Sequence, residues 1–284
     1  SDLARITVDY VAHNLGLVGN SLDCSRKATN KFFMREALER HELPIPKYQL
    51  VSTASDINYE ELCLPCIVKP IDRSGSRGIT LVSNISDLND AILNSQKESF
   101  VEEVLVEEYV TGREYSVESI SYQGKHSVLQ VTEKFTSGSP NFIERAHLAP
   151  AKISKDTELN IIKIIYCSLT SLGIINGASH AEIKITETND IKIIEIGARM
   201  GGDFIGSHLV KNNTGYNYVN AVIDVAMGEK IELPNTQSMV IAECYSLVVY
   251  FFNELQYNQL NEIVNIPGVD VIHTNRNKEY NGIV

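Results

Sequence analysis

Two glutamates near the middle of the chain, Glu182 and Glu195, have a spacing that could bind a divalent cation. Each lies in an isoleucine-rich run of alternating polarity, and residues 188–190 between the runs are typical of a turn, which predicts a β-hairpin. A two-residue turn at Thr188-Asn189 would place the two carboxylates opposite each other. Facing carboxylates repel unless a cation neutralises them, and all-oxygen ligation suits Mg²⁺ or Mn²⁺. Two unrelated acids on a solvated face fit the pattern equally well, and a turn at Asn189-Asp190 would break the pairing.

A single cation, Arg199, follows in the glycine-rich segment 197–202. The planar guanidinium suits a carboxylate or a phosphoryl group, although a surface salt bridge is an alternative role. The glycines Gly201 and Gly206 have the spacing of a P-loop, but Ser207-His208 follows where Lys-Ser or Lys-Thr is required. We therefore exclude a P-loop.

A cationic loop lies earlier in the chain. Residues 66–68 read as a buried strand that ends at Lys69-Pro70, and a Gly-Ser-Arg loop over 72–78 leads to a second strand at 79–82. Glycines let backbone N–H groups approach a polyphosphate, and a lysine on the strand can reach the same oxygens. The loop is therefore a candidate phosphate-binding loop, with an ordinary turn as the alternative.

An acidic segment connects two further predicted strands, over 104–110 and onward from 113, with a turn at Thr111-Gly112. Glu107, Glu108 and Glu114 lie around this turn. Such acids and free backbone groups can bind the amino edge of an adenine and the hydroxyls of a ribose. The alternative is an edge strand with protective charges.

Composition limits the class of protein. The chain has 284 residues, 43% of them hydrophobic, which is enough for a large core in two lobes. A net charge of -11 without tryptophan disfavours a nucleic-acid groove. Five scattered cysteines suit a reducing compartment, and neither a signal peptide nor a membrane span is evident. We expect a cytoplasmic protein.

In their order along the chain, five segments resemble the ATP-grasp superfamily, most strongly its carboxylate–amine ligase branch, which includes carbamoyl-phosphate-synthase large subunits and L-amino acid ligases. They are residues 26–48, 67–79, 104–119, 177–186 and 193–204. The resemblance implies an α+β ATP-grasp fold in which two α+β lobes clamp a nucleotide between antiparallel sheets.

The resemblance also implies a role for each candidate residue. Those for the nucleotide phosphates are Lys31 and Lys69, with Ser74, Gly75, Ser76 and Gly78 in the closing loop. Those for adenine are Glu107 and the backbone of Tyr109 and Val110, and that for ribose is Glu114. Glu182 and Glu195 would bind Mg²⁺ or Mn²⁺, and Arg199 would stabilise the transferred phosphoryl group. The segment that ends at Glu144, Arg145 and His147 resembles the substrate-side loop of the branch.

One departure from the family pattern concerns the metal. Many members have Asn-Pro where this chain has Gly197-Ala198. A third metal ligand is then missing or is supplied by another group.

The resemblance predicts four parts. Residues 1–24, in which 3–15 have helical periodicity, would be the remnant of a missing N-terminal Rossmann-like domain. Residues 25–106 would form the N-lobe, beginning with a helix over 26–41, and residues 107–236 the C-lobe with the metal site. Residues 237–284, with predicted strands at 240–250 and 269–273, would be C-terminal strands that stop where relatives continue.

The implied activity is an ADP-forming ligase. ATP would phosphorylate a small carboxylate to an acyl phosphate, which an amine then attacks to form an amide or peptide bond. ATP with Mg²⁺ or Mn²⁺ would be required. We expect neither nucleic acid nor membrane as a partner, and a homodimer stays open. The alternatives are the use of bicarbonate, as in carbamoyl-phosphate synthase or biotin carboxylase, and a nucleotide-binding fragment without turnover.

Overall fold

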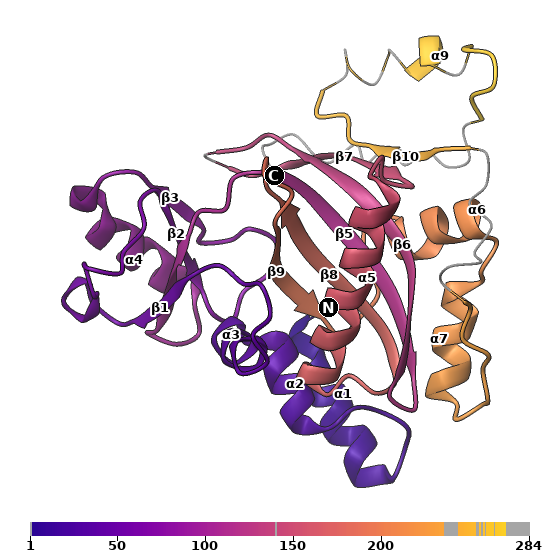
Figure 1. Ribbon diagram of the computed structural model, residues 1–284, viewed down its shortest axis with the longest axis horizontal. Helices are drawn as coiled ribbons and strands as arrows, with labels where there is room; N and C mark the ends of the chain where they lie inside the picture. The colour runs from indigo at the N-terminus through magenta and orange to yellow at the C-terminus, as the bar shows by residue number, and fades with distance from the viewer. Residues whose placement is uncertain are drawn as a thin grey trace.

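The protein is an α+β structure with two antiparallel sheets, as the sequence predicts (Figure 1). The computed structural model describes residues 2–139, 141–235 and 244–253, together with 256, 258, 260–263 and 265–270. No helix in these ranges is long and apolar enough to cross a membrane. The predicted strand at 240–250 is described from residue 244 and contains β10, whereas most of the strand predicted at 269–273 lies outside the described residues.

The smaller sheet has the strand order β1-β4-β2-β3 and packs one face on helix α4. Cys66 and Val68 of β2 and Val106 of β4 are buried against this helix. Because strand side chains alternate, Lys69 and Glu107 point to the opposite face, toward the larger sheet. Strand β4 lies between β1 and β2, so the edge-strand alternative for the acidic segment is wrong. The elements are β1 (Tyr48–Val51), β2 (Cys66–Pro70), β3 (Thr80–Val82), α4 (Leu88–Glu98), β4 (Val104–Glu108) and the short 3₁₀ turns η1 (Ala54–Asp56) and η2 (Ile85–Asp87).

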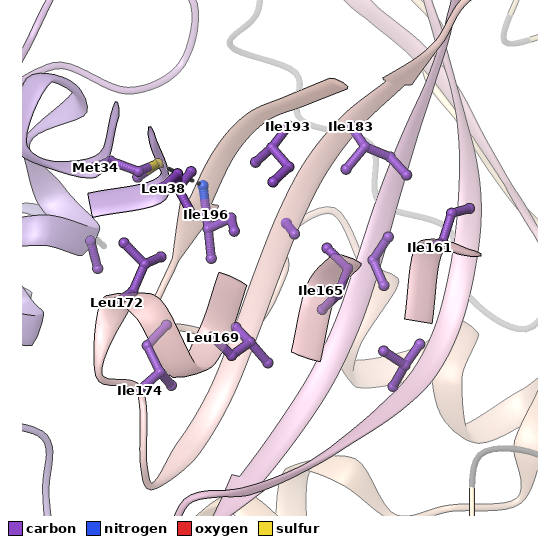
Figure 2. Close-up of a cluster of buried hydrophobic side chains, with 14 of the residues drawn as sticks. Met34, Leu38, Ile161, Ile165, Leu169, Leu172, Ile174, Ile183, Ile193 and Ile196 are labelled. Atoms are coloured by element: carbon purple, nitrogen blue, oxygen red, sulfur yellow. Dashed lines mark hydrogen bonds between the residues drawn. The ribbon is translucent and has the colours of Figure 1, made fainter. Parts of the chain in front are cut away.

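The larger sheet has the order β10-β7-β6-β5-β8-β9, and helix α5 (Lys155–Leu172) covers one face (Figure 1). Ile161, Ile165 and Leu169 of α5 pack against isoleucines of β8 and β9 (Figure 2). The N-cap of α5 is Ser154, whose hydroxyl accepts a hydrogen bond from the Thr157 amide. The strands are β5 (Arg113–Tyr122), β6 (Lys125–Thr136), β7 (Glu144–Ala149), β8 (Gly177–Ile185), β9 (Ile191–Gly197) and β10 (Ser246–Val249).

The opposite face of the larger sheet carries the polar residues of the same strands. Alternation places Glu118 of β5 and Glu182 of β8 on this face, while Val117 and Ile183 face α5. Short helices cover the far end of this face, where Tyr218 packs on Ile120. The covering elements are the π-helix η3 (Ile205–Leu209), α6 (Val210–Thr214) and α7 (Tyr218–Ala226), and α9 (Leu260–Ile263) follows β10.

The N-terminal segment forms three helices, α1 (Asp2–Leu15), α2 (Leu22–Thr29) and α3 (Lys31–Glu39). The predicted helix over 3–15 is confirmed. The single helix predicted over 26–41 is wrong, because the Asn30 side chain accepts hydrogen bonds from the amides of Phe32 and Phe33 and starts a new helix.

Helices α2 and α3 pack in the core of the larger sheet, although the predicted boundaries place residues 25–39 in the N-lobe. Met34 and Leu38 lie in this core (Figure 2). The predicted boundary between 106 and 107 also falls inside β4. The two cores therefore divide the chain differently from the predicted lobes.

The β8–β9 hairpin pairs Glu182 with Glu195, as predicted, but not by the predicted turn. Ile185 pairs with Ile191, and the chain turns through a three-residue loop at 187–189, in which Asn189 has φ +64°. This loop alone would put Glu182 opposite Ile194. A β-bulge beside Glu182 inserts one residue into β9 and restores the pairing of the glutamates.

Candidate active site

A cleft lies between the polar faces of the two sheets. It receives side chains from β2 and β4 of the smaller sheet and from β6 and β8 of the larger one. Of the sequence-predicted residues, those that line it are Lys69, Ser76, Glu107, Tyr109, Val110, Glu114 and Glu182. The other lining residues are Pro46, Ile67, Ile79, Glu108, Tyr115, Lys134, Phe142, Ile183, Lys184 and Ile194.

A buried ion cluster forms one wall of the cleft. Glu107, only 3% exposed, binds Arg35 Nε through Oε1 (2.7 Å) and Lys69 Nζ through Oε2 (2.6 Å). Burial alone would raise the pKa of Glu107, but Arg35 and Lys69 hold it at about 2. Both carboxylate oxygens of Glu107 therefore hold cations in place, and the adenine contact of this side chain stays a prediction.

Arg35 and Lys69 share the single carboxylate of Glu107, so this wall has more cations than anions. Burial lowers the pKa of Lys69, and the nearby Arg35 and Lys31 lower it further, while Glu107 opposes them. One carboxylate is thus shared between cations, and an anion entering the cleft would complete their neutralisation.

The facing carboxylates of Glu182 and Glu195 are each paired with a lysine. Glu195 Oε1 lies 3.1 Å from Lys31 Nζ, and Glu182 Oε1 lies 3.3 Å from Lys134 Nζ. Lys134 holds the pKa of Glu182 well below its usual value, against the effect of burial and with help from His180. Both glutamate side chains are about one-third exposed, at 33% and 29%. Two accessible carboxylates on neighbouring strands suit a hard divalent cation.

Another part of the cleft combines the aromatic ring of Tyr109 with a further lysine, Lys184. Lys184 Nζ lies 3.1 Å from Glu114 Oε1, donates to the Val110 carbonyl (3.1 Å) and lies 4.9 Å from the centre of the Tyr109 ring. The Phe142 ring contacts Tyr109 at a centroid distance of 6.4 Å. This part of the cleft offers apolar area, a carboxylate and backbone groups to a flat polar ligand. Sequence reasoning missed Lys184, although its two-residue spacing from Glu182 indicates the same face.

The cationic loop between β2 and β3 contributes Ser76 to the cleft, while Ser74, Gly75 and Gly78 lie outside its lining. Ser76 has φ +56° and Gly75 φ +70°. At Gly78, with φ +69°, a side chain would lie 2.9 Å from Pro70 Cγ, so the turn requires glycine there. The loop is anchored by Arg73, whose guanidinium lies 3.5 Å from the centre of the Phe100 ring.

Arg199 lies in the loop after β9, where its Nη1 donates to the Met200 carbonyl (3.2 Å). It does not line the cleft in this structure. The neighbouring Gly201 amide donates to Glu118 Oε2 (2.9 Å), and Glu118 Oε1 contacts His180 Nδ1. Sequence reasoning missed Glu118 and did not assign a role to His180.

A third group of ligand atoms, from Glu144, His147 and Asp203, lies within 4.8 Å of one another. Lys134 joins it to the facing carboxylates, because its Nζ is 2.6 Å from Glu144 Oε1. The pKa of Glu144 is lowered to about 2: burial would raise it, and His147 and Lys134 lower it. Of the three residues predicted on the substrate side, Glu144 and His147 point here, whereas Arg145 is exposed.

Comparison with known proteins identifies the family to which this chain belongs. A family model described as an ATP-grasp domain matches residues 62–207, more than half of the chain. The chain belongs to the ATP-grasp family. This match covers all the cleft-lining residues except Pro46.

Individual ATP-grasp relatives are similar over most of this chain. The alanine–anticapsin ligase of Bacillus subtilis is 24% identical, covering 90% of this chain and 60% of the relative. The carbamoyl phosphate synthase large chain of Thermotoga maritima is 26% identical, covering 78% and 21%. The crystal structure of an L-amino acid ligase from Bacillus licheniformis is 28% identical, with a TM-score of 0.72, and covers 80% and 54%. The chain thus spans little more than half the length of the two ligases.

Proposed function

We propose that this chain is the ATP-grasp part of an ADP-forming carboxylate–amine ligase that makes an amide or peptide bond through an acyl phosphate. The alanine–anticapsin ligase and the L-amino acid ligase support this activity by similarity. The observation that carries the proposal is the combination of side chains that line the cleft. Glu182, which faces Glu195, lines the cleft with Lys69 and Lys134, and the same cleft is lined by Tyr109, Val110 and Glu114.

In this proposal the adenine and ribose bind beside Tyr109, Val110 and Glu114. Lys31 and Lys69 bind the phosphates, and the loop with Ser74, Gly75, Ser76 and Gly78 closes over them. In the structure Lys31 pairs with Glu195. A small movement of its side chain would bring the ammonium group to a phosphate oxygen. We propose that Lys31 lies between the metal ligands and the phosphates.

The carboxylates Glu182 and Glu195 fit Mg²⁺ or Mn²⁺, which would neutralise the charge on the terminal phosphates. The chain's own contribution is positioning and charge. Lys69 is fixed by Glu107, and Lys134 holds Glu182 ionised. We propose that Arg199 swings from the Met200 carbonyl toward the transferred phosphoryl group.

The reaction needs no enzyme nucleophile. A carboxylate oxygen of the substrate attacks the γ-phosphorus, and ADP leaves. The amine nitrogen then attacks the acyl carbon, phosphate leaves and the nitrogen loses a proton. We propose that Glu144 and His147 face the acceptor, because Lys134 joins Glu144 to Glu182 and His147 contacts Glu144.

The test is to trap the acyl phosphate. The protein is incubated with ATP, Mg²⁺ and a panel of amino acids and small carboxylates, with hydroxylamine in place of the amine. We expect a hydroxamate and an equal amount of ADP. AMP as the nucleotide product would show adenylation and refute the mechanism. Nucleotide binding without product from any carboxylate would favour a non-catalytic role.

A further inference from the structure

A buried carboxylate behind the facing glutamates has no role in the proposed chemistry. Glu118 is 0% exposed and lies on β5, next to β8 in the larger sheet. Oε2 accepts a hydrogen bond from the Gly201 amide (2.9 Å), which fixes the carboxylate. Oε1 contacts His180 Nδ1.

The other nitrogen of this histidine points to the metal site. His180 Nε2 lies 3.7 Å from Glu182 Oε1. The space around the contact is tightly filled, because a Cβ at Gly201 would collide with Glu118 Oε1 and lie 2.7 Å from His180 Nδ1. The imidazole ring is therefore held in one orientation by a carboxylate that is itself held by the backbone.

We propose that Glu118 and His180 are positioning residues, which orient the Glu182 carboxylate for a divalent cation. The inference rests on the proposed function, in which Glu182 is a metal ligand. The Gly201 amide fixes Glu118, Glu118 fixes the ring, and the ring limits the movement of Glu182. Hydrogen-bonded groups behind metal ligands commonly set metal affinity in this way.

A purely structural ion pair is the competing explanation. Strands β5 and β8 are already held by nine paired positions, from Arg113 opposite Ile185 to Ser121 opposite Gly177. A buried charge pair costs desolvation that apolar side chains would avoid, so it adds little to such a ladder. His180 Nε2 faces Glu182, and strand pairing does not require this orientation.

Two variants separate the steps. Glu118→Gln keeps the shape and the acceptor for the Gly201 amide, but its amide N–H₂ faces Nδ1 and removes the charged partner. His180→Asn keeps a donor near Glu118 and removes the atom that faces Glu182. The matched control is Glu133→Gln. Glu133 is a buried glutamate of the same sheet that is paired with Arg113 and is not among the residues that line the cleft.

Mn²⁺ affinity is measured by electron paramagnetic resonance with a saturating non-hydrolysable ATP analogue, and the metal-free affinity for the analogue by calorimetry in chelator. We expect Glu118→Gln and His180→Asn each to raise the Mn²⁺ Kd by about 10- to 100-fold. The metal-free nucleotide Kd should not change, and Glu133→Gln should match wild type in both measurements.

Wild-type Mn²⁺ affinity in folded Glu118→Gln and His180→Asn would overturn the inference, whatever their melting temperatures. If Glu118→Gln does not fold, His180→Asn decides, because it leaves the Glu118–Gly201 bond in place. A wild-type protein that binds no nucleotide would instead overturn the proposed function itself.

Discussion

At the scale of single residues, the cleft is a set of shared charges. Lys134 is bound by Glu144 and Glu182, and these two glutamates raise its pKa despite the burial that would lower it. Glu107 is shared by Arg35 and Lys69. Removing one member therefore changes the charge balance of its neighbours, so substitutions here should not act independently.

The first prediction concerns the facing glutamates. Glu182→Gln and Glu195→Gln should each abolish most Mn²⁺ binding with the ATP analogue, and the double variant should be little worse, because two ligands of one ion act as a unit. Electron paramagnetic resonance measures the binding. Glu187→Gln, at an exposed position in the loop of the same hairpin, is the control. Additive losses in the double variant would argue against a shared ion.

The same variants test the charge balance without metal. The sequence alone suggests that glutamine would relieve a repulsion between facing carboxylates. In the structure Lys31 and Lys134 already neutralise them, so melting temperatures in chelator should fall rather than rise. Glu195→Gln should be the more sensitive of the two, because the buried Lys31 would lose its carboxylate partner, whereas Lys134 keeps Glu144 in Glu182→Gln.

The second prediction is a pH dependence. The pKa of Glu107 is lowered from the ordinary 4.5 to about 2 in the folded protein, so its contribution to stability is complete above about pH 4.5 and is lost as the pH falls through about 2. Glu107→Gln should lose about 3–5 kcal/mol near neutral pH, because Arg35 and Lys69 stay buried without an anion. The gap to wild type should narrow below about pH 4.5. Urea unfolding across this range measures it, and a gap that stays constant with pH would refute the assignment.

At the scale of elements, the sequence predicted those whose signals are local. The signals of helix α5 are all in its own segment, because Ser154 caps it, isoleucines form its apolar stripe and Gly173 at φ +75° ends it. The hairpin was predicted with the correct glutamate pairing but the wrong turn. The compensating bulge is supported from outside the hairpin, where Arg35 donates to the Ile194 carbonyl (2.7 Å), and no local pattern reveals that contact.

In the site, too, residues with a local sequence signal were predicted, and residues that depend on contacts between distant segments were missed. Residues in charged motifs, such as Lys69 and Glu114, were predicted because the motif marks them. Lys134 was missed because its partners, Glu144 and Glu182, lie on other strands, and only the folded sheet brings the three together. The ion pair between Glu107 and Arg35 was missed for the same reason, since Arg35 comes from a distant helix.

The third prediction concerns the connection between β4 and β5. Gly112 has φ +146°, a conformation nearly confined to glycine, and a Cβ there would collide with the Ile185 carbonyl and lie 3.0 Å from Thr186 Cα. Gly112→Ala should therefore destabilise the protein by about 3 kcal/mol or more, since backbone cannot move aside. Gly124→Ala is the control, because its φ is +75° but nothing lies within 4 Å, and strain alone costs about 1–2 kcal/mol. Equal losses by urea unfolding would show that the contact with Ile185 is unimportant.

At the scale of the whole molecule, the chain is acidic, but several lysines lie in the cleft between the two sheets. The net charge is -11, which repels a polyphosphate at long range. Lys31 and Lys69 are nevertheless buried near the cleft, and the Lys134 side chain is only 9% exposed, so screening is weak and these charges act strongly at short range. Nucleotide binding should therefore depend on these few groups rather than on the overall field.

The last prediction follows from the division of ligands between the sheets. Lys69 and the loop over 72–78 belong to the smaller sheet, whereas Glu182, Glu195 and the loop over 197–202 belong to the larger one. In hydrogen exchange, a metal-free ATP analogue should protect 72–78 and 109–112, because lysines and backbone groups alone bind it. Adding Mg²⁺ should extend the protection to 197–202, because only a cation joins the phosphates to the facing glutamates. Glu182→Gln should remove this second step and keep the first. If Mg²⁺ left 197–202 unprotected in the wild type, the glutamates would not link the nucleotide to the larger sheet.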